Sequence, residues 1–90
     1  MKRPIIVINP NSNQSVTDGL RECLAQFNNN KSHPIECVTL KNGPFGIESQ
    51  LDSDSVILPL ANFVKTRPDA GAFVIACYSD PGIDTCRSVT

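Results

Sequence analysis

Two short, continuous apolar runs constrain the fold more than any other feature of the sequence. Ile5 to Ile8 and Ala72 to Ala76 contain no polar residue, and polar, turn-forming residues follow each of them. Their shortness and their lack of alternation are typical of buried strands in a parallel sheet that helices cover on both faces. We therefore expect an α/β domain that is built around these two strands.

The segments between these runs supply further elements of such a domain. Apolar residues at helical spacing predict a helix from about Gln14 to Phe27, with Ser12 or Asn13 as its cap. A second, more exposed strand is expected at Pro34 to Leu40. The long loop that follows, Lys41 to Gln50, is of a length that is often functional in compact domains.

Two more helices complete the pattern. Leu51 to Thr66 has helical periodicity, but Pro59 lacks a backbone donor, so we expect a break there with Pro59 in the first turn of the longer piece. Later, Ser79 or Asp80 followed by Pro81 predicts a helix whose first residue is the proline. Strands and helices thus alternate. Right-handed crossovers then give a three-layer, flavodoxin-like parallel sheet with the strand order 2-1-3.

Composition bounds the class of protein. Ninety residues make one domain, and 40% hydrophobic with 19% charged residues is ordinary for a globular protein. The net charge of −1 and the scattered lysines and arginines argue against nucleic-acid binding. No apolar run is long enough for a membrane span or a secretory signal, so we expect a cytoplasmic protein.

The four cysteines are expected to be reduced thiols. The sequence has neither a secretory signal nor a Cys-x-x-Cys pair, which argues against a disulfide framework. His33 is the single histidine, and it precedes the second strand, at the amino end of the sheet. We therefore expect no metal site and no cysteine–histidine nucleophile pair.

Polar residues and a cysteine follow the two buried strands. Asn9 and Asn11 come after the first strand, and Cys77 and Ser79 come after the last. Because these strands are neighbours in the expected order, both segments should line one crevice at the carboxyl edge of the sheet, where α/β proteins bind ligands. A thiol that faces a helix N-terminus loses its proton more readily, and the thiolate is the reactive form.

A purely structural interpretation of the same residues stays open. Free cysteines often pack as small hydrophobic residues, which would place Cys77 in the core. Asn-Pro-Asn-Ser at residues 9–12 is good turn and capping chemistry, and Ser79 is a suitable helix cap.

Three motifs stand in order along the chain. They are Ile-Val-Ile-Asn-Pro-Asn-Ser at residues 6–12, Gly-Pro at 43–44 with Ile-Glu-Ser at 47–49, and Val-Ile-Ala-Cys-Tyr-Ser-Asp-Pro-Gly at 74–82. Together they resemble the Asp/Glu racemase superfamily, and within it the hydantoin/allantoin racemase branch. The resemblance implies that residues 1–90 are the first of two similar α/β domains. The active site would lie between the domains, and the second domain would lie outside this chain.

The resemblance also implies a mechanism. Two cysteine thiols of such enzymes act on opposite faces of a carbon acid, here a cyclic ureide of the hydantoin or allantoin type, without cofactor or metal. Cys77 matches the first of these thiols, whereas Cys23 and Cys37 are not placed to face it across a substrate. The positions that match substrate-facing residues of the family are Asn9, Pro10, Asn11, Phe45, Gly46, Ser49, Tyr78 and Ser79. The expected partner is a small-molecule substrate, and the full-length enzyme is expected to be a homo-oligomer.

The chain departs from the family at three points, of which the most important is that the cysteine of the second domain is absent. Tyr78 and Ser79 stand where relatives usually have Phe-Gly, which leaves the substrate open, and Cys86 stands where relatives tend to have a small residue, so we interpret it as packing. Other superfamily activities are alternatives: an amino-acid racemase, a maleate isomerase or a decarboxylase. An alternative of another class is a truncated, non-catalytic flavodoxin-like module that binds a small anion or a protein.

Overall fold

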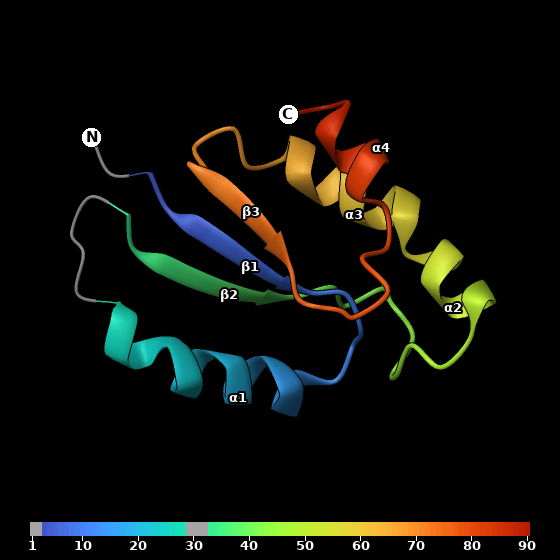
Figure 1. The fold of residues 1–90 in the computed structure, drawn as a ribbon, viewed down its shortest axis with the longest axis horizontal. Coiled ribbons are helices and arrows are strands. Elements are labelled where there is room, and N and C mark those ends of the chain that lie inside the picture. Colours follow the sequence, from blue (N-terminus) through green and yellow to red (C-terminus); the bar gives the residue numbers. More distant parts are fainter. Residues whose placement is uncertain (1–2, 29–32) are drawn as a thin grey trace.

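A parallel sheet forms the centre of the computed structural model, which describes residues 3–28 and 33–90. Its three strands are β1 (Ile5–Asn9), β2 (Ile35–Thr39) and β3 (Ala72–Ile75), and they lie in the order β2-β1-β3 (Figure 1). Both pairs of neighbouring strands are parallel. The α/β fold class and the strand order that the sequence predicts are confirmed.

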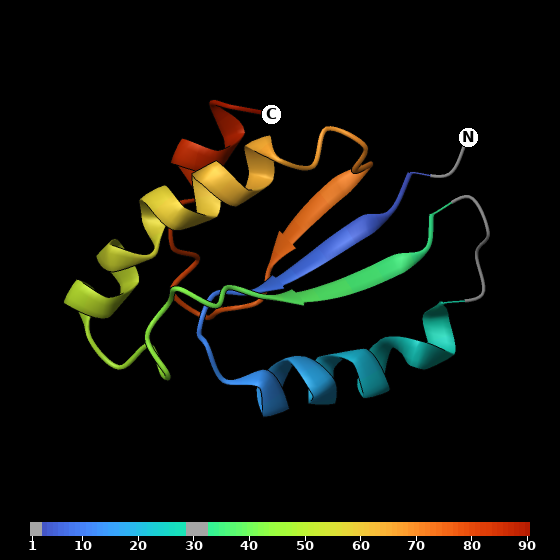
Figure 2. The same cartoon turned by 180° about the vertical axis from the view of Figure 1, so that it is seen from behind.

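Helices cover both faces of this sheet. On one face lies α1 (Gln14–Leu24), which continues into the short 3-10 helix η1 (Ala25–Phe27). On the other side lie α2 (Gln50–Ser55), α3 (Ile57–Lys65) and α4 (Ile83–Arg87), as the view from behind also shows (Figure 2). The chain thus has the three layers of a flavodoxin-like domain. Within the described residues, none of these helices is long and apolar enough to cross a membrane.

The first helix begins where the sequence predicts. Asn13 is its N-cap, and the side chain of Asn13 accepts a hydrogen bond from the backbone N–H of Ser15 at 3.1 Å. The helical segment reaches Phe27, as predicted, but its last three residues form the 3-10 helix η1.

The hydrophobic core lies between the sheet and α3. Ile6 and Ile8 of the central strand have no exposed surface, and Phe73 and Ile75 of β3 pack against the same cluster. The buried members of this core are Ile6, Ile8, Leu40, Val56, Leu60, Ala61, Val64 and Cys86. Removal of this apolar surface from water is the main favourable term in the folding of a chain of this size.

The face of the sheet toward α1 is less well covered. The apolar stripe of α1 and η1 is only partly buried, because Val16 on α1 is 41% exposed and Phe27 on η1 is 63% exposed. α1 packs mainly against β2 and β1. Side chains of a strand alternate between the two faces of a sheet, so Val74 points toward the α1 face, and it stays half exposed. The sheet is thus open beneath β3, and the expectation that this strand is buried on both faces is wrong, because Ala72 and Val74 are exposed.

Pro59 lies where the second helical segment divides. α2 ends at Ser55 and α3 begins at Ile57, which places Pro59 in the first turn of α3. In that turn the backbone N–H groups have no partner within the helix, so the proline leaves no hydrogen bond unmade. The predicted break is confirmed, and it falls just before the proline.

The last helix begins later than the sequence predicts. Pro81 is not its first residue, and neither Ser79 nor Asp80 caps it, because α4 starts only after Gly82. Gly82 is the N-cap and has a φ of 73°, a left-handed conformation that residues with a Cβ rarely adopt. The chain closes a turn first, in which the N–H of Asp80 donates to the carbonyl of Cys77 at 3.1 Å. This turn contains the residues that were expected to start the helix.

An ion-pair network ties the segment before β3 to the sheet. Nη2 of Arg67 donates to Oε1 of Glu36 on β2 at 2.9 Å and to Oδ2 of Asp69 at 3.0 Å. These hydrogen bonds from Arg67 hold the pKa of Glu36 and the pKa of Asp69 below their usual range. All three side chains are partly exposed, so solvent screens the interaction.

Replacing Arg67 with Met is expected to make the fold less sensitive to acid. The pKa of Glu36 and the pKa of Asp69 are lowered in the folded chain, so the network stabilises it fully above the unfolded-state values of about 4. That contribution is lost as the pH falls through the lower folded-state values. The parent chain should therefore lose more stability than Arg67→Met between about pH 6 and about pH 3. Urea unfolding followed by circular dichroism measures both losses.

The control for the Arg67 experiment is Lys65→Met. It removes a positive charge from an exposed position of α3 that forms no ion pair with any described residue. This variant should keep the acid sensitivity of the parent. Identical pH dependence in the parent and in Arg67→Met would contradict the prediction.

Candidate active site

The segments that follow β1 and β3 leave the sheet side by side. The N–H of Ala76 donates to the carbonyl of Ile8 at 2.9 Å. This hydrogen bond continues the pairing of β1 and β3 by one residue beyond the end of β3. Residues 9–11 and 77–79 therefore start from neighbouring positions at the carboxyl edge, where the strand arrowheads point in Figure 1. This is the edge that the sequence predicts for the site.

The amide of Asn9 organises this edge from inside. Its side chain is 1% exposed, and its Nδ2 donates to Oδ1 of Asn11 at 2.8 Å and to Oγ1 of Thr17 at 3.1 Å. A third, longer hydrogen bond reaches the carbonyl of Asn13 at 3.2 Å. Pro10 is buried as well. Asn9 and Pro10 thus support the turn after β1 from below, although the sequence places both among the substrate-facing positions.

Asn11 stands differently from Asn9. Its Oδ1 accepts hydrogen bonds from Nδ2 of Asn9 and from the N–H of Asn13, the latter at 2.9 Å, which fixes the plane of the amide. Its own Nδ2 makes no hydrogen bond to any described residue, and the side chain is partly exposed. Asn11 therefore carries an oriented N–H donor that is available to a carbonyl or carboxylate oxygen.

Loop 41–49 is docked onto the same turn. The N–H of Ser12 donates to the carbonyl of Pro44 at 2.8 Å. Gly43 lies so close that a Cβ there would stand 2.3 Å from the carbonyl oxygen of Pro10. Only a residue without a side chain fits this approach, so Gly43 determines how near the loop lies to the turn.

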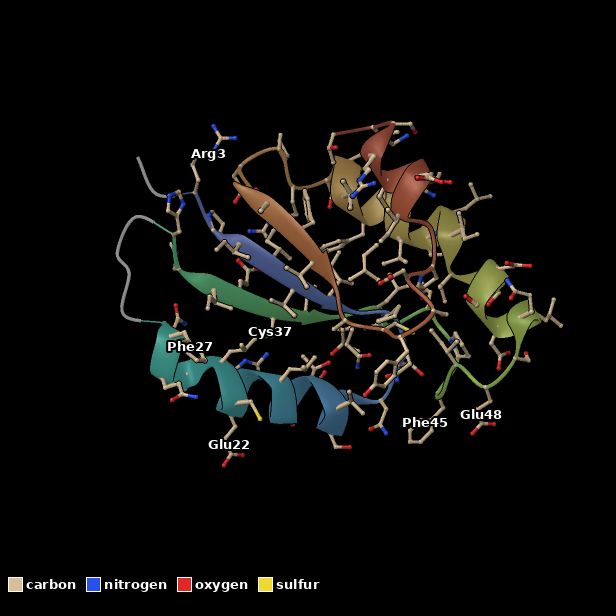
Figure 3. The ribbon with its side chains drawn as sticks, viewed as in Figure 1. Arg3, Glu22, Phe27, Cys37, Phe45 and Glu48 are labelled. Atoms are coloured by element: carbon tan, nitrogen blue, oxygen red, sulfur yellow. The ribbon has the colours of Figure 1, made fainter. Side chains whose placement is uncertain are left out.

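The docked loop presents its predicted site residues in different ways. Phe45 is 73% exposed and projects outward near Glu48 (Figure 3), while Gly46 is partly buried. Ser49 is the N-cap of α2, and its Oγ accepts a hydrogen bond from the N–H of Asp52 at 3.1 Å. The hydroxyl of Ser49 thus has a structural partner, whereas the ring of Phe45 has little contact with the fold.

Cys77 begins the turn after β3. Its thiol is partly exposed, and Sγ lies 3.5 Å from Oγ of Ser79. Tyr78 between them is fully exposed. An open hollow of about 470 Å³ beside the thiol is lined by Leu20, Ala76, Cys77, Tyr78 and Asp80. Asn11 and Phe45 share the carboxyl edge with Cys77 but do not line this hollow. This hollow is therefore not the single crevice, lined by both segments, that the sequence predicts.

Two polar residues of this edge are not foreseen by the sequence analysis. Thr17 is wholly buried, and its Oγ1 lies 2.6 Å from Oγ1 of Thr39, which ties α1 to β2. Ser53 on α2 is 5% exposed, and its Oγ lies 3.0 Å from Oγ of Ser79. Both are small hydroxyl residues within helices, and only their position on the inward face of the helix could have singled them out.

The other thiols differ from Cys77 in their surroundings. Burial raises the pKa of Cys37, against a smaller opposing effect of Arg21, and burial also raises the pKa of Cys86. Cys23 is exposed on α1. In the described ranges, no three His, Cys, Asp or Glu side chains gather closely enough to hold a metal ion. The polar side chains at this edge include the thiol of Cys77, the hydroxyl of Ser79, the carboxylate of Asp80 and the amide of Asn11.

Comparisons with known proteins match this arrangement to one family. A family model described as Asp/Glu/Hydantoin racemase matches residues 5–90. A hydantoin racemase from Pseudomonas sp. (strain NS671) is 39% identical over 88 residues, and the match covers 96% of this chain and 35% of that relative. A hydantoin racemase from Paenarthrobacter aurescens is 32% identical over 91 residues, with 96% and 37% covered. No solved structure matches the chain.

Two glycine substitutions are expected to change stability in opposite directions. Gly43→Ala should lower the free energy of unfolding by about 1–3 kcal/mol, because the new Cβ collides with the backbone of the turn. Gly19→Ala, in the middle of α1 with no atom within 4 Å of the new Cβ, should raise it by about 0.5–1 kcal/mol. Urea titrations of both variants measure the effects. A Gly43→Ala chain as stable as the parent would show that loop 41–49 is not held against the turn.

Cys77 is expected to be the first of the four thiols to react with limiting iodoacetamide. Cys37 and Cys86 are buried and their pKa is raised, so they should react only on unfolding. Cys23 is exposed but has no hydroxyl partner among the described residues, whereas Ser79 stands beside Cys77. Peptide mapping after partial labelling gives the order, and Cys77→Ser is the control. Faster labelling of Cys23 would contradict this expectation.

Proposed function

The chain belongs to the Asp/Glu/hydantoin racemase family, and from this premise we propose that it supplies one of two catalytic thiols to a hydantoin or allantoin racemase. The observation that carries the proposal is the place of Cys77. It is a partly exposed thiol at the carboxyl edge of a parallel sheet, with a hydroxyl 3.5 Å from its sulfur. In open α/β sheets, ligands bind in the crevice beyond the carboxyl ends of the strands, which is where Cys77 lies.

The proposed reaction needs no group beyond two thiols. The thiolate of Cys77 takes the proton from the ring carbon next to a carbonyl: the C–H bond breaks, an S–H bond forms, and the electron pair moves onto the carbonyl oxygen as an enolate. A second thiol, from a part of the protein outside this chain, returns a proton to the opposite face. The C–H bond forms again with inverted configuration, and the two thiols have exchanged one proton in total.

Asn11 is suited to the charge that develops in this reaction. Two hydrogen bonds to Oδ1 of Asn11 fix the plane of the amide and thereby the direction of Nδ2. Nδ2 itself makes no hydrogen bond to any described residue. An N–H donor of fixed direction stabilises an enolate oxygen more than it stabilises a neutral carbonyl. We therefore assign Asn11 to the substrate oxygen and Asn9 to the support of Asn11.

The open side of the site belongs to the same proposal. The chain spans 35% and 37% of the lengths of the two relatives that it matches. Phe45 and Tyr78 are large side chains that stand almost free of the fold at the carboxyl edge. In the assembled enzyme we expect the second domain and the substrate to cover both rings, because exposed apolar groups beside a polar site usually have a partner.

A fusion protein tests the proposal. The chain replaces the matching region of the Pseudomonas sp. hydantoin racemase, and the fusion is given an enantiopure 5-substituted hydantoin. Polarimetry should record racemisation, and Cys77→Ser in the fusion should slow it by about 10²-fold or more because one face of the carbon then lacks its base. The ninety-residue chain alone should give no net racemisation.

The unaltered relative is the positive control for this fusion, and circular dichroism verifies that the fusion and its Cys77→Ser variant fold alike. Racemisation by the ninety-residue chain alone would contradict the two-thiol mechanism. A Cys77→Ser fusion with unchanged rate would remove Cys77 from it.

A further inference from the structure

A buried hydroxyl lies behind the Cys77 turn. Ser53, on the inward face of α2, is 5% exposed, and its Oγ lies 3.0 Å from Oγ of Ser79. Oγ of Ser79 in turn lies 3.5 Å from Sγ of Cys77. Three side chains from two separate parts of the chain thus form a continuous row that leads from the interior to the thiol.

We infer that Ser53 is a positioning residue, which holds the Ser79 hydroxyl so that it donates its proton toward the sulfur of Cys77 and favours the thiolate. The inference rests on the proposed function, since it takes Cys77 to be the reactive thiol. Each serine has one proton to donate. If Ser53 donates to Oγ of Ser79, the single proton of Ser79 is left for the sulfur, and hydrogen bonds in such a row strengthen one another.

The two serines differ in how firmly they are held. Ser53 belongs to a helix, where its N–H donates to the carbonyl of Ser49 at 3.0 Å, and its side chain is enclosed. Ser79 is an exposed residue of a turn, whose hydroxyl would otherwise rotate toward water. A hydrogen bond to a fixed neighbour removes that freedom, so the direction of the Ser79 hydroxyl depends on Ser53.

A merely structural role for Ser53 makes a different prediction. The Ser53–Ser79 hydrogen bond would then only fasten α2 to the turn, and its loss would lower stability without changing the chemistry of Cys77. The reaction of Cys77 with iodoacetamide, followed by peptide mapping over a range of pH, separates the two roles because the thiolate is the reacting form.

The experiment compares the parent chain with three single variants and one double variant. Ser53→Ala should slow the alkylation of Cys77 about fivefold near neutral pH, and by less at high pH, where the thiol is ionised in every form. Ser55→Ala is the matched control, because that exposed hydroxyl of the same helix donates to the carbonyl of Asp52 and does not contact Ser79. Ser79→Ala should slow alkylation at least as much as Ser53→Ala. In the Ser79→Ala background, Ser53→Ala should have no further effect.

The alkylation rates decide whether Ser53 has this positioning role. An unchanged profile in Ser53→Ala, or an equal slowing in the presence and absence of Ser79, overturns the inference. If circular dichroism shows that Ser53→Ala has lost its fold, the Ser79→Ala chain alone decides, since Ser79 is on the surface: normal alkylation of Cys77 there overturns the inference as well.

The readout is independent of catalysis. If the fusion protein racemises through Cys77 while Ser53→Ala alkylates like the parent, only the role of Ser53 is wrong. If the profile shifts as expected while the fusion is inactive, the proposed function is wrong and the hydroxyl row stands. In both cases the alkylation of Cys23 serves as the internal reference, because it is exposed on α1, on a different element from Ser53.

Discussion

The buried amide of Asn9 is the interaction on which the carboxyl edge of this protein depends. It stands at the end of the central strand and joins the turn after β1 to α1 through Asn11 and Thr17. Thr17 passes the connection on to Thr39 and thereby to β2. A buried amide that lost these partners would carry a desolvation penalty of about 1–3 kcal/mol, so the three elements hold one another in a single arrangement. The exposed donor of Asn11 inherits its direction from this network.

Much of the fold could be predicted because local signals and tertiary packing agree. The apolar run of β1, the cap at Asn13 and the position of Pro59 each indicate a preference that the folded chain satisfies, whereas the run of β3 forms a strand that is only partly buried. The start of α4 could not be predicted in the same way. Ser-Asp-Pro is a good helix start by itself, but a turn closed by Asp80 and the left-handed Gly82 delay the helix. Here the local turn between Cys77 and Asp80 overrides the propensity of Ser-Asp-Pro to start a helix.

The candidate site was predictable as a place but not in its detail. Strand order and polar composition lead to the carboxyl edge, where Asn11 and Cys77 do lie. The sequence does not show in which direction a side chain points, so it gives Asn9 and Asn11 the same predicted role. In the structure Asn9 is enclosed, whereas Asn11 carries a free donor. Ser53 is the opposite case. It looks like a solvent-facing serine of a polar helix and is in fact buried against the turn of Cys77.

The order of the strands has a consequence for how the chain folds. The central strand pairs with β2 and with β3, and the second pairing joins Ile5 to Ala72, which are far apart in sequence. The loop entropy of such a contact must be overcome before the core between sheet and α3 is complete, so the chain is expected to fold slowly for its size. On the ribosome, β1 cannot pair with β3 until residues beyond 70 have emerged. Until then the edge of β1 that pairs with β3 has no partner strand, and unpaired strand edges of this kind favour aggregation.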